Sequence, residues 1–159
     1  MSELKPKFIT DYFNGIWTAK VFSNGIFERN IVIQWQFDNE NDRQPRQSGR
    51  WKVTAEMEIA DENILEGISG WKNDIGRWSD LWFTELGGYK ELQWTSMKEM
   101  NGIDVLFGFI HECDMKDDDP AEHIALCELY DANKFKFTSQ SYSRGIMEVI
   151  AKRSQPTLR

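Results

Sequence analysis

Residues 31–37, Ile-Val-Ile-Gln-Trp-Gln-Phe, and residues 51–59, Trp-Lys-Val-Thr-Ala-Glu-Met-Glu-Ile, decide the fold of this chain. In both stretches apolar side chains occupy every second position, and polar side chains fill most of the positions between them. A period of two places alternate side chains on opposite faces of an extended strand. The two stretches therefore predict β-strands with one dry face and one wet face.

Turn signals divide the rest of the chain into similar short pieces. Seven short breaks and two longer ones make nine connections, which predict ten strands. The short breaks are Asn24-Gly25, Asp61-Glu62-Asn63, Asn73 to Gly76, Gly87-Gly88, Asn101-Gly102, Asp131 to Asn133 and Ser143 to Gly145; the longer ones are Asn39 to Gly49 and Asp114 to Pro120. The two Asn-Gly pairs favour tight type I′ hairpins, because both central residues of that turn need a positive φ.

Short strands joined by hairpins, with no long helical pattern between them, predict an all-β fold. Closing such a meander removes its two exposed edges. We therefore predict one domain over residues 1–159: a single antiparallel up-and-down β-barrel of about ten strands spanning residues 15–153. A short helical turn over Lys7 to Asn14, capped by Thr10 or Asp11, is expected to cover one end.

The charge balance argues against several classes of partner. The chain has 19 Lys and Arg against 26 Asp and Glu, a formal net charge of −7. Such a chain repels phosphate backbones and anionic lipid, so we expect neither nucleic acid nor membrane as a partner. The sequence shows no secretory signal and no apolar run of bilayer length, and its two cysteines form no Cys-x-x-Cys pair. A cytoplasmic location is the expectation.

Gly15-Ile16-Trp17 stands at the head of the first strand, and Lys152-Arg153 ends the last one. This arrangement resembles the Gly-x-Trp signature of the lipocalin and calycin barrels, in which a C-terminal basic residue lies across the tryptophan. The resemblance implies a cation–π contact of Arg153 with Trp17 at the closed end. The stretch from Trp71 to Gly88 and the ending from Phe135 are similar to an uncharacterised bacterial family of lipocalin-like domains. The resemblance implies an apolar small-molecule ligand; the histidine pattern of haem-binding calycins is not matched, and we expect no cofactor.

Four tryptophans fall at alternating positions of neighbouring strands and are expected to line a cavity inside the barrel: Trp35, Trp51, Trp78 and Trp82. The alternative is that these bulky rings simply fill the interior. Ten strands enclose a wider space than eight, which favours a cavity. Phe107 and Phe109 are expected to share the inner face.

The only two histidines flank the acidic loop Asp114 to Pro120. A hairpin centred near Asp117 would place His111 opposite His123, on the same face as Phe107 and Phe109. Such a pair could orient a ligand or transfer protons. Cys113 is the nearest candidate for a third metal ligand, but we predict no metal site, and a structural role of the histidines is the alternative.

Arg43 and Arg46 belong to the long loop Asn39 to Gly49, which also carries acidic residues. Their guanidinium groups could meet an anionic group of a ligand at a portal, or they could be ordinary solvated charges. The chain has no Gly-x-Ser-x-Gly, phosphate-binding loop or His-Glu-x-x-His motif.

Three functions follow from these patterns. The first is binding of a small, largely apolar molecule, with or without an anionic group, in an aromatic cavity. The second is a small barrel enzyme, a cyclase, isomerase or lyase, that uses His111 and His123 for proton transfer. The third is an interaction domain that forms a homodimer through the strands at 103–113 and 122–130. We predict the first and do not expect an enzyme.

Overall fold

The computed structural model describes residues 3–38, 48–55, 62–72, 74–83, 88–113, 121–141 and 145–154. One helix, α1 (Pro6–Phe13), precedes ten strands. The strands are β1 (Gly15–Ser23), β2 (Ile26–Phe37), β3 (Ser48–Ala55), β4 (Glu62–Lys72), β5 (Arg77–Phe83), β6 (Tyr89–Met100), β7 (Ile103–Cys113), β8 (Ala121–Asp131), β9 (Lys134–Ser141) and β10 (Gly145–Arg153). The prediction of ten strands is confirmed.

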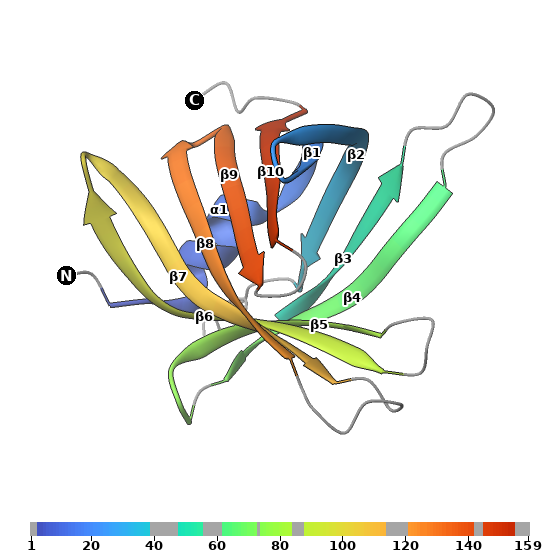
Figure 1. Ribbon diagram of the computed structural model, residues 1–159. Helices are drawn as coiled ribbons and strands as arrows, with labels where there is room; N and C mark the ends of the chain where they lie inside the picture. The colour runs from blue at the N-terminus through green and yellow to red at the C-terminus, as the bar shows by residue number, and fades with distance from the viewer. Residues whose placement is uncertain are drawn as a thin grey trace.

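The ten strands form one closed antiparallel barrel (Figure 1). Every strand pairs with its neighbours in sequence, and β1 closes the barrel by pairing with both β2 and β10. The predicted up-and-down topology is therefore confirmed. Among the described residues, no helix has the length and apolarity needed to cross a bilayer.

Both Asn-Gly pairs form the predicted hairpin turns. Asn24 and Gly25 have φ values of 50° and 81°, and Asn101 and Gly102 have 53° and 81°. These are the positive values that a type I′ turn requires. At the expected break Asp61-Glu62-Asn63, Glu62 and Asn63 belong to strand β4 instead. Met57 and Ile59, expected in β3, lie outside the described residues.

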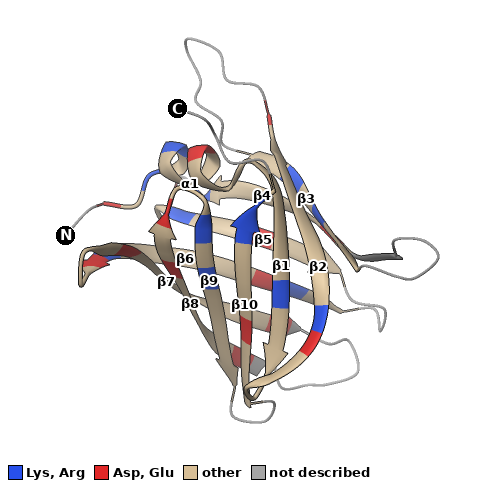
Figure 2. Cartoon of the chain, turned by 90° about the horizontal axis from the view of Figure 1, so that it is seen from above, with Lys and Arg blue, Asp and Glu red and all other residues tan. Residues whose placement is uncertain are grey.

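Helix α1 covers one end of the barrel (Figure 2). Its buried residues are Ile9, Thr10 and Phe13. The predicted cap was wrong: the helix begins earlier, with Lys5 at the N-cap position and no side-chain cap. Pro6 follows at the first helical position, where its fixed φ suits the helix and its missing N–H costs nothing.

Trp17 and Arg153 fasten this closed end. The Arg153 guanidinium lies 4.2 Å from the centre of the fully buried Trp17 ring, the contact that the resemblance implied. It also donates hydrogen bonds to the carbonyl oxygens of Tyr12, Asn14 and Ala132 at 2.5, 2.7 and 3.1 Å. One side chain thus ties β10 to the end of α1 and to the β8–β9 turn.

Large rings packed on glycines determine which side chains point inward. The Trp51 ring lies over Gly67 on β4, where an added Cβ would come within 2.3 Å of the ring. At Gly108 on β7, an added Cβ would come within 2.9 Å of the Trp94 ring. Both glycines must therefore face the interior, and every second residue along their strands faces it with them.

Candidate functional site

The barrel interior contains a cavity of about 190 Å³. Helix α1 contributes Ile9 and Phe13 to its lining at the closed end. Trp35, Trp51, Trp78 and Trp82, the four expected on the inner face, all line it, together with Trp94. The described part of the barrel is therefore hollow as well as aromatic.

Asp80 is the acidic residue of this otherwise apolar lining. It lies on β5 between the inward-facing Trp78 and Trp82 and is 7% exposed. Its carboxylate accepts hydrogen bonds from the Ser69 hydroxyl on the adjacent strand and from the Trp78 side chain. Burial raises the pKa of Asp80 to about 6, although both hydrogen bonds act in the opposite direction. A carboxyl group therefore stands in a low-dielectric wall with part of its accepting capacity unused.

Trp51 contributes an unpaired donor. The residue is 8% exposed, and its indole N–H has no hydrogen-bond partner. A buried donor without an acceptor costs on the order of 1–3 kcal/mol. The neighbouring ring atom Cε2 lies against Gly67, so this edge of the ring faces the next strand. Among the described lining residues, the Asp80 carboxyl is therefore the polar group that the cavity offers, and apolar walls with few polar groups are the usual composition of a small-molecule site.

A second, more polar chamber of about 210 Å³ adjoins this cavity and shares Trp82, Ile110 and Met147 with it. Its charged group is a cluster of Lys90, Glu112 and His123. The Lys90 Nζ and His123 Nε2 atoms lie 2.7 and 3.3 Å from the same Glu112 oxygen. Burial opposes ionisation of the Glu112 carboxyl group. Its hydrogen bonds and electrostatic interactions with Lys90 and His123 nevertheless hold the pKa of Glu112 below its usual value. The chamber therefore holds a largely compensated ion cluster.

The predicted pairing of the two histidines is wrong. His111 lies opposite Glu122, and His123 lies opposite Ile110, so the register differs by one residue from the expected one. That difference sends the side chains to opposite faces of the sheet. His123 faces the polar chamber, whereas the His111 side chain is 29% exposed on the outside.

Phe107 and Phe109 do not line the cavity either. They pair with Leu126 and Ile124 on the outer face, where Ile124 is 71% exposed. The reason is Gly108: because it must face inward under the Trp94 ring, both neighbours must face outward.

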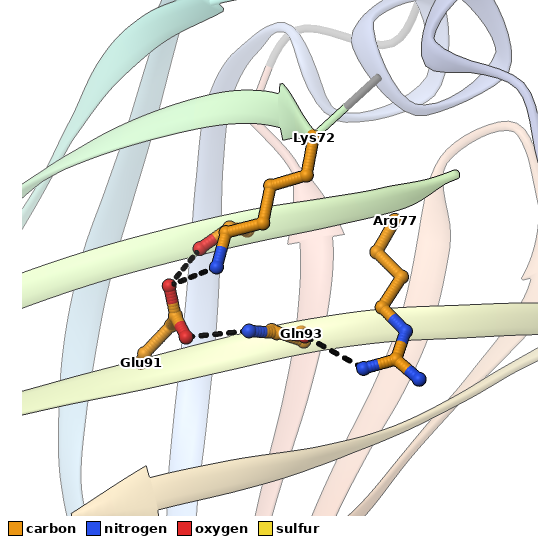
Figure 3. A network of polar contacts seen from close by, with 5 residues as sticks. Lys72, Arg77, Glu91 and Gln93 are labelled. Carbon is orange, nitrogen blue, oxygen red and sulfur yellow. Dashed lines mark hydrogen bonds and ion pairs between the residues drawn. The ribbon is translucent and has the colours of Figure 1, made fainter. Parts of the chain in front are cut away.

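The outer surface beside Phe109 carries a chain of polar contacts (Figure 3). Glu91 pairs with Lys72 at 3.0 Å and accepts hydrogen bonds from Ser79 and Gln93. Arg77 donates to Gln93 at 3.2 Å, and its guanidinium lies 5.8 Å from the centre of the Phe109 ring. The Arg77 guanidinium therefore packs against the Phe109 ring on the outer face of the barrel.

Three other predictions concern residues or side chains that the structure does not describe. Arg43 and Arg46 lie outside the described residues, and so does the acidic loop from Asp114. The side chain of Cys113 is likewise not described. Within the described ranges, no three His, Cys, Asp or Glu side chains gather in a geometry that could hold a metal ion.

Sequence reasoning missed Asp80, Lys90 and Glu112. A signal for Asp80 was present, since an acid stands two residues from a tryptophan on each side and so shares their face. No comparable signal marks Lys90 and Glu112. They are brought into the chamber only by the pairing of β6 with β7.

Comparison with known proteins adds little to this picture. No protein-family model matches the chain, and neither does any curated protein. Among solved structures, the chain is similar to a redesigned beta barrel, at 8% sequence identity and a TM-score of 0.43, over 98% of this chain and 100% of that one.

Proposed function

We propose that this protein binds a small, largely apolar molecule in the aromatic cavity of its barrel. The observation that carries the proposal is a cavity of about 190 Å³ whose described lining includes five tryptophans and one carboxyl group. An engineered apolar cavity of roughly 150 Å³ is large enough for benzene. The proposed ligand is therefore compact, about the size of one or two fused rings.

The resemblance to lipocalin and calycin barrels supports the same function. Gly15, Trp17 and Arg153 occupy the closed end that such barrels share, and the cavity begins directly above it. We accordingly propose a lipocalin-like binding protein. The buried free thiol of Cys127 suits a reducing cytoplasm, which we propose as its location. The anionic group considered for the ligand depends on Arg43 and Arg46 and stays a prediction.

The enzyme alternative loses its basis, because it required the two imidazoles to meet inside the barrel. His111 on the outer face cannot exchange a proton with a substrate held beside His123. We therefore propose binding alone.

Tryptophan fluorescence and thermal unfolding test the proposal with indole and toluene as probes. Both should quench or shift the emission and raise the melting temperature, because a ligand that binds only the folded state stabilises it. Val53→Phe should abolish both effects by filling the cavity, since Val53 belongs to its lining. Thr54→Phe, one residue along the same strand, is the matched control. Absence of any response to either probe, or an unchanged response in the Val53 variant, contradicts the proposal.

A further inference from the structure

The cavity wall has the chemistry of an aromatic cage for a positive charge. Tryptophan rings present a negative face, and cations bind best to tryptophan among the aromatic side chains. Five tryptophans line this cavity, and two of them, Trp78 and Trp82, flank Asp80 on the same strand face. Trp51 packs edge-to-face on Trp82, with ring centres 5.4 Å apart, so it belongs to the same group.

The charges in the cavity wall also favour a positively charged ligand. Among the described lining residues, Asp80 supplies a carboxylate, and there is neither a lysine nor an arginine. Cys127, the other titratable group of the lining, stays neutral because burial raises its pKa well above the usual value. Lys90 and His123 lie in the adjoining chamber, where both contact the Glu112 carboxylate. An anion placed against the ionised Asp80 would be repelled.

A cation in an apolar cavity loses its hydration, and this cost is acceptable only where an opposite charge and further polar contacts replace the water. Asp80 supplies the opposite charge. Two donors, Ser69 and Trp78, hold its carboxylate in place and leave acceptor positions unused.

From this arrangement we infer that the ligand is a small organic cation, an alkyl- or arylammonium compound, held by the tryptophans and the Asp80 carboxylate. The inference rests on the proposed function and narrows it to a ligand class. The net charge of −7 would draw such cations toward the protein before they bind.

Three probes of one shape but different charge test the inference: choline, the neutral 3,3-dimethylbutan-1-ol and the anionic 3,3-dimethylbutanoate. Affinities are measured by tryptophan fluorescence and calorimetry. Choline should bind at least about tenfold more tightly than the neutral alcohol, and the carboxylate most weakly. Asp80→Asn keeps the side-chain shape and should remove the preference for choline without weakening the alcohol. Asp74→Asn, the same change at an exposed turn, is the matched control.

A pH series on the wild type gives a second readout that needs no variant at position 80. Choline has a fixed charge, so a rise in its affinity between about pH 5 and pH 7 reports ionisation in the protein. The adjoining chamber also holds His123. The series is therefore repeated with His123→Gln, in which the rise should persist if Asp80 is the group responsible.

The outcomes separate this inference from the proposed function. Equal binding of choline and the alcohol overturns the inference and leaves binding of apolar molecules standing. Tightest binding of the carboxylate also overturns it, in favour of an anionic ligand. If none of the three binds while indole does, the inference again fails. Failure of all of these probes together refutes both proposals.

Discussion

Replacement of Asp80 by Asn should change how the stability of this protein depends on pH. Burial raises the pKa of Asp80 from 3.8 to about 6 in the folded protein. The difference is about two pKa units, or roughly 3 kcal/mol at 1.36 kcal/mol per unit. Because the folded carboxyl holds its proton more tightly than the unfolded one, raising the pH from about 4 to about 6 destabilises the fold by that amount. Above this range the whole cost is present, and below it the cost is absent.

Asn cannot ionise, and its amide oxygen can still accept from Ser69 and Trp78. The free energy of unfolding of Asp80→Asn minus that of the wild type should therefore increase by about 3 kcal/mol between pH 4 and pH 7. Urea unfolding followed by tryptophan fluorescence measures both proteins at each pH. Other acids, such as Glu112, titrate equally in both and cancel in the difference. Asp74→Asn, the same change at an exposed turn, is the control for the substitution itself.

A constant difference between Asp80→Asn and the wild type over this range would refute the reasoning. It would mean that Asp80 is as well solvated in the folded protein as in the unfolded chain. The cavity could then not be the dry, aromatic space described above, and the cage for a cation would lose its counter-charge.

Three further predictions follow. Arg153→Met should lower the free energy of unfolding by about 2–3 kcal/mol, because three carbonyl oxygens lose their hydrogen-bond donor and the cation–π contact is removed. The control Lys152→Met should change it by no more than about 0.5 kcal/mol in the same urea titration. Gly108→Ala should lower the free energy of unfolding by about 3 kcal/mol or prevent folding, because its Cβ would lie 1.9 Å from a backbone oxygen of β6 that cannot rotate away. Circular dichroism measures whether the variant folds, and urea unfolding measures its stability. Glu91→Gln should lower the free energy of unfolding by about 1 kcal/mol at pH 7 and by less at pH 3. Burial opposes ionisation of Glu91, but its hydrogen bonds and the charge of Lys72 outweigh burial and lower its pKa. The stabilisation therefore disappears as the carboxyl group protonates in the folded state.

The closed barrel could be predicted because its signals are local. Alternation in residues 31–37 defines a strand without reference to the rest of the chain, and each Asn-Gly pair defines a hairpin by its own φ requirement. Trp17 and Arg153 were found through the resemblance, and the structure brings them into contact.

The register of β7 with β8 could not be predicted in the same way. Residues 105–110 are apolar on both faces, so alternation gives no preference for either one. The inward-facing residues of β7 are determined instead by Gly108 and the Trp94 ring of the neighbouring strand. That contact joins two strands and depends on a bulge in β6 between Trp94 and Ser96. A bulge inserts one extra residue into a strand, and the spacing of apolar residues in this sequence does not predict where it lies.

The same pairing of rings with glycines explains why this barrel is hollow. A large ring opposite an ordinary side chain must project toward the barrel axis, and several such rings would fill the interior. Opposite Gly67, the Trp51 ring instead lies against the bare backbone of the next strand, and Phe37 does the same over Gly49. These rings line the wall of the cavity, and Asp80 faces the space that they leave. A count of aromatic residues could not distinguish a filled barrel from an empty one, but the glycines at positions 49, 67 and 108 show where a ring lies flat against the neighbouring strand.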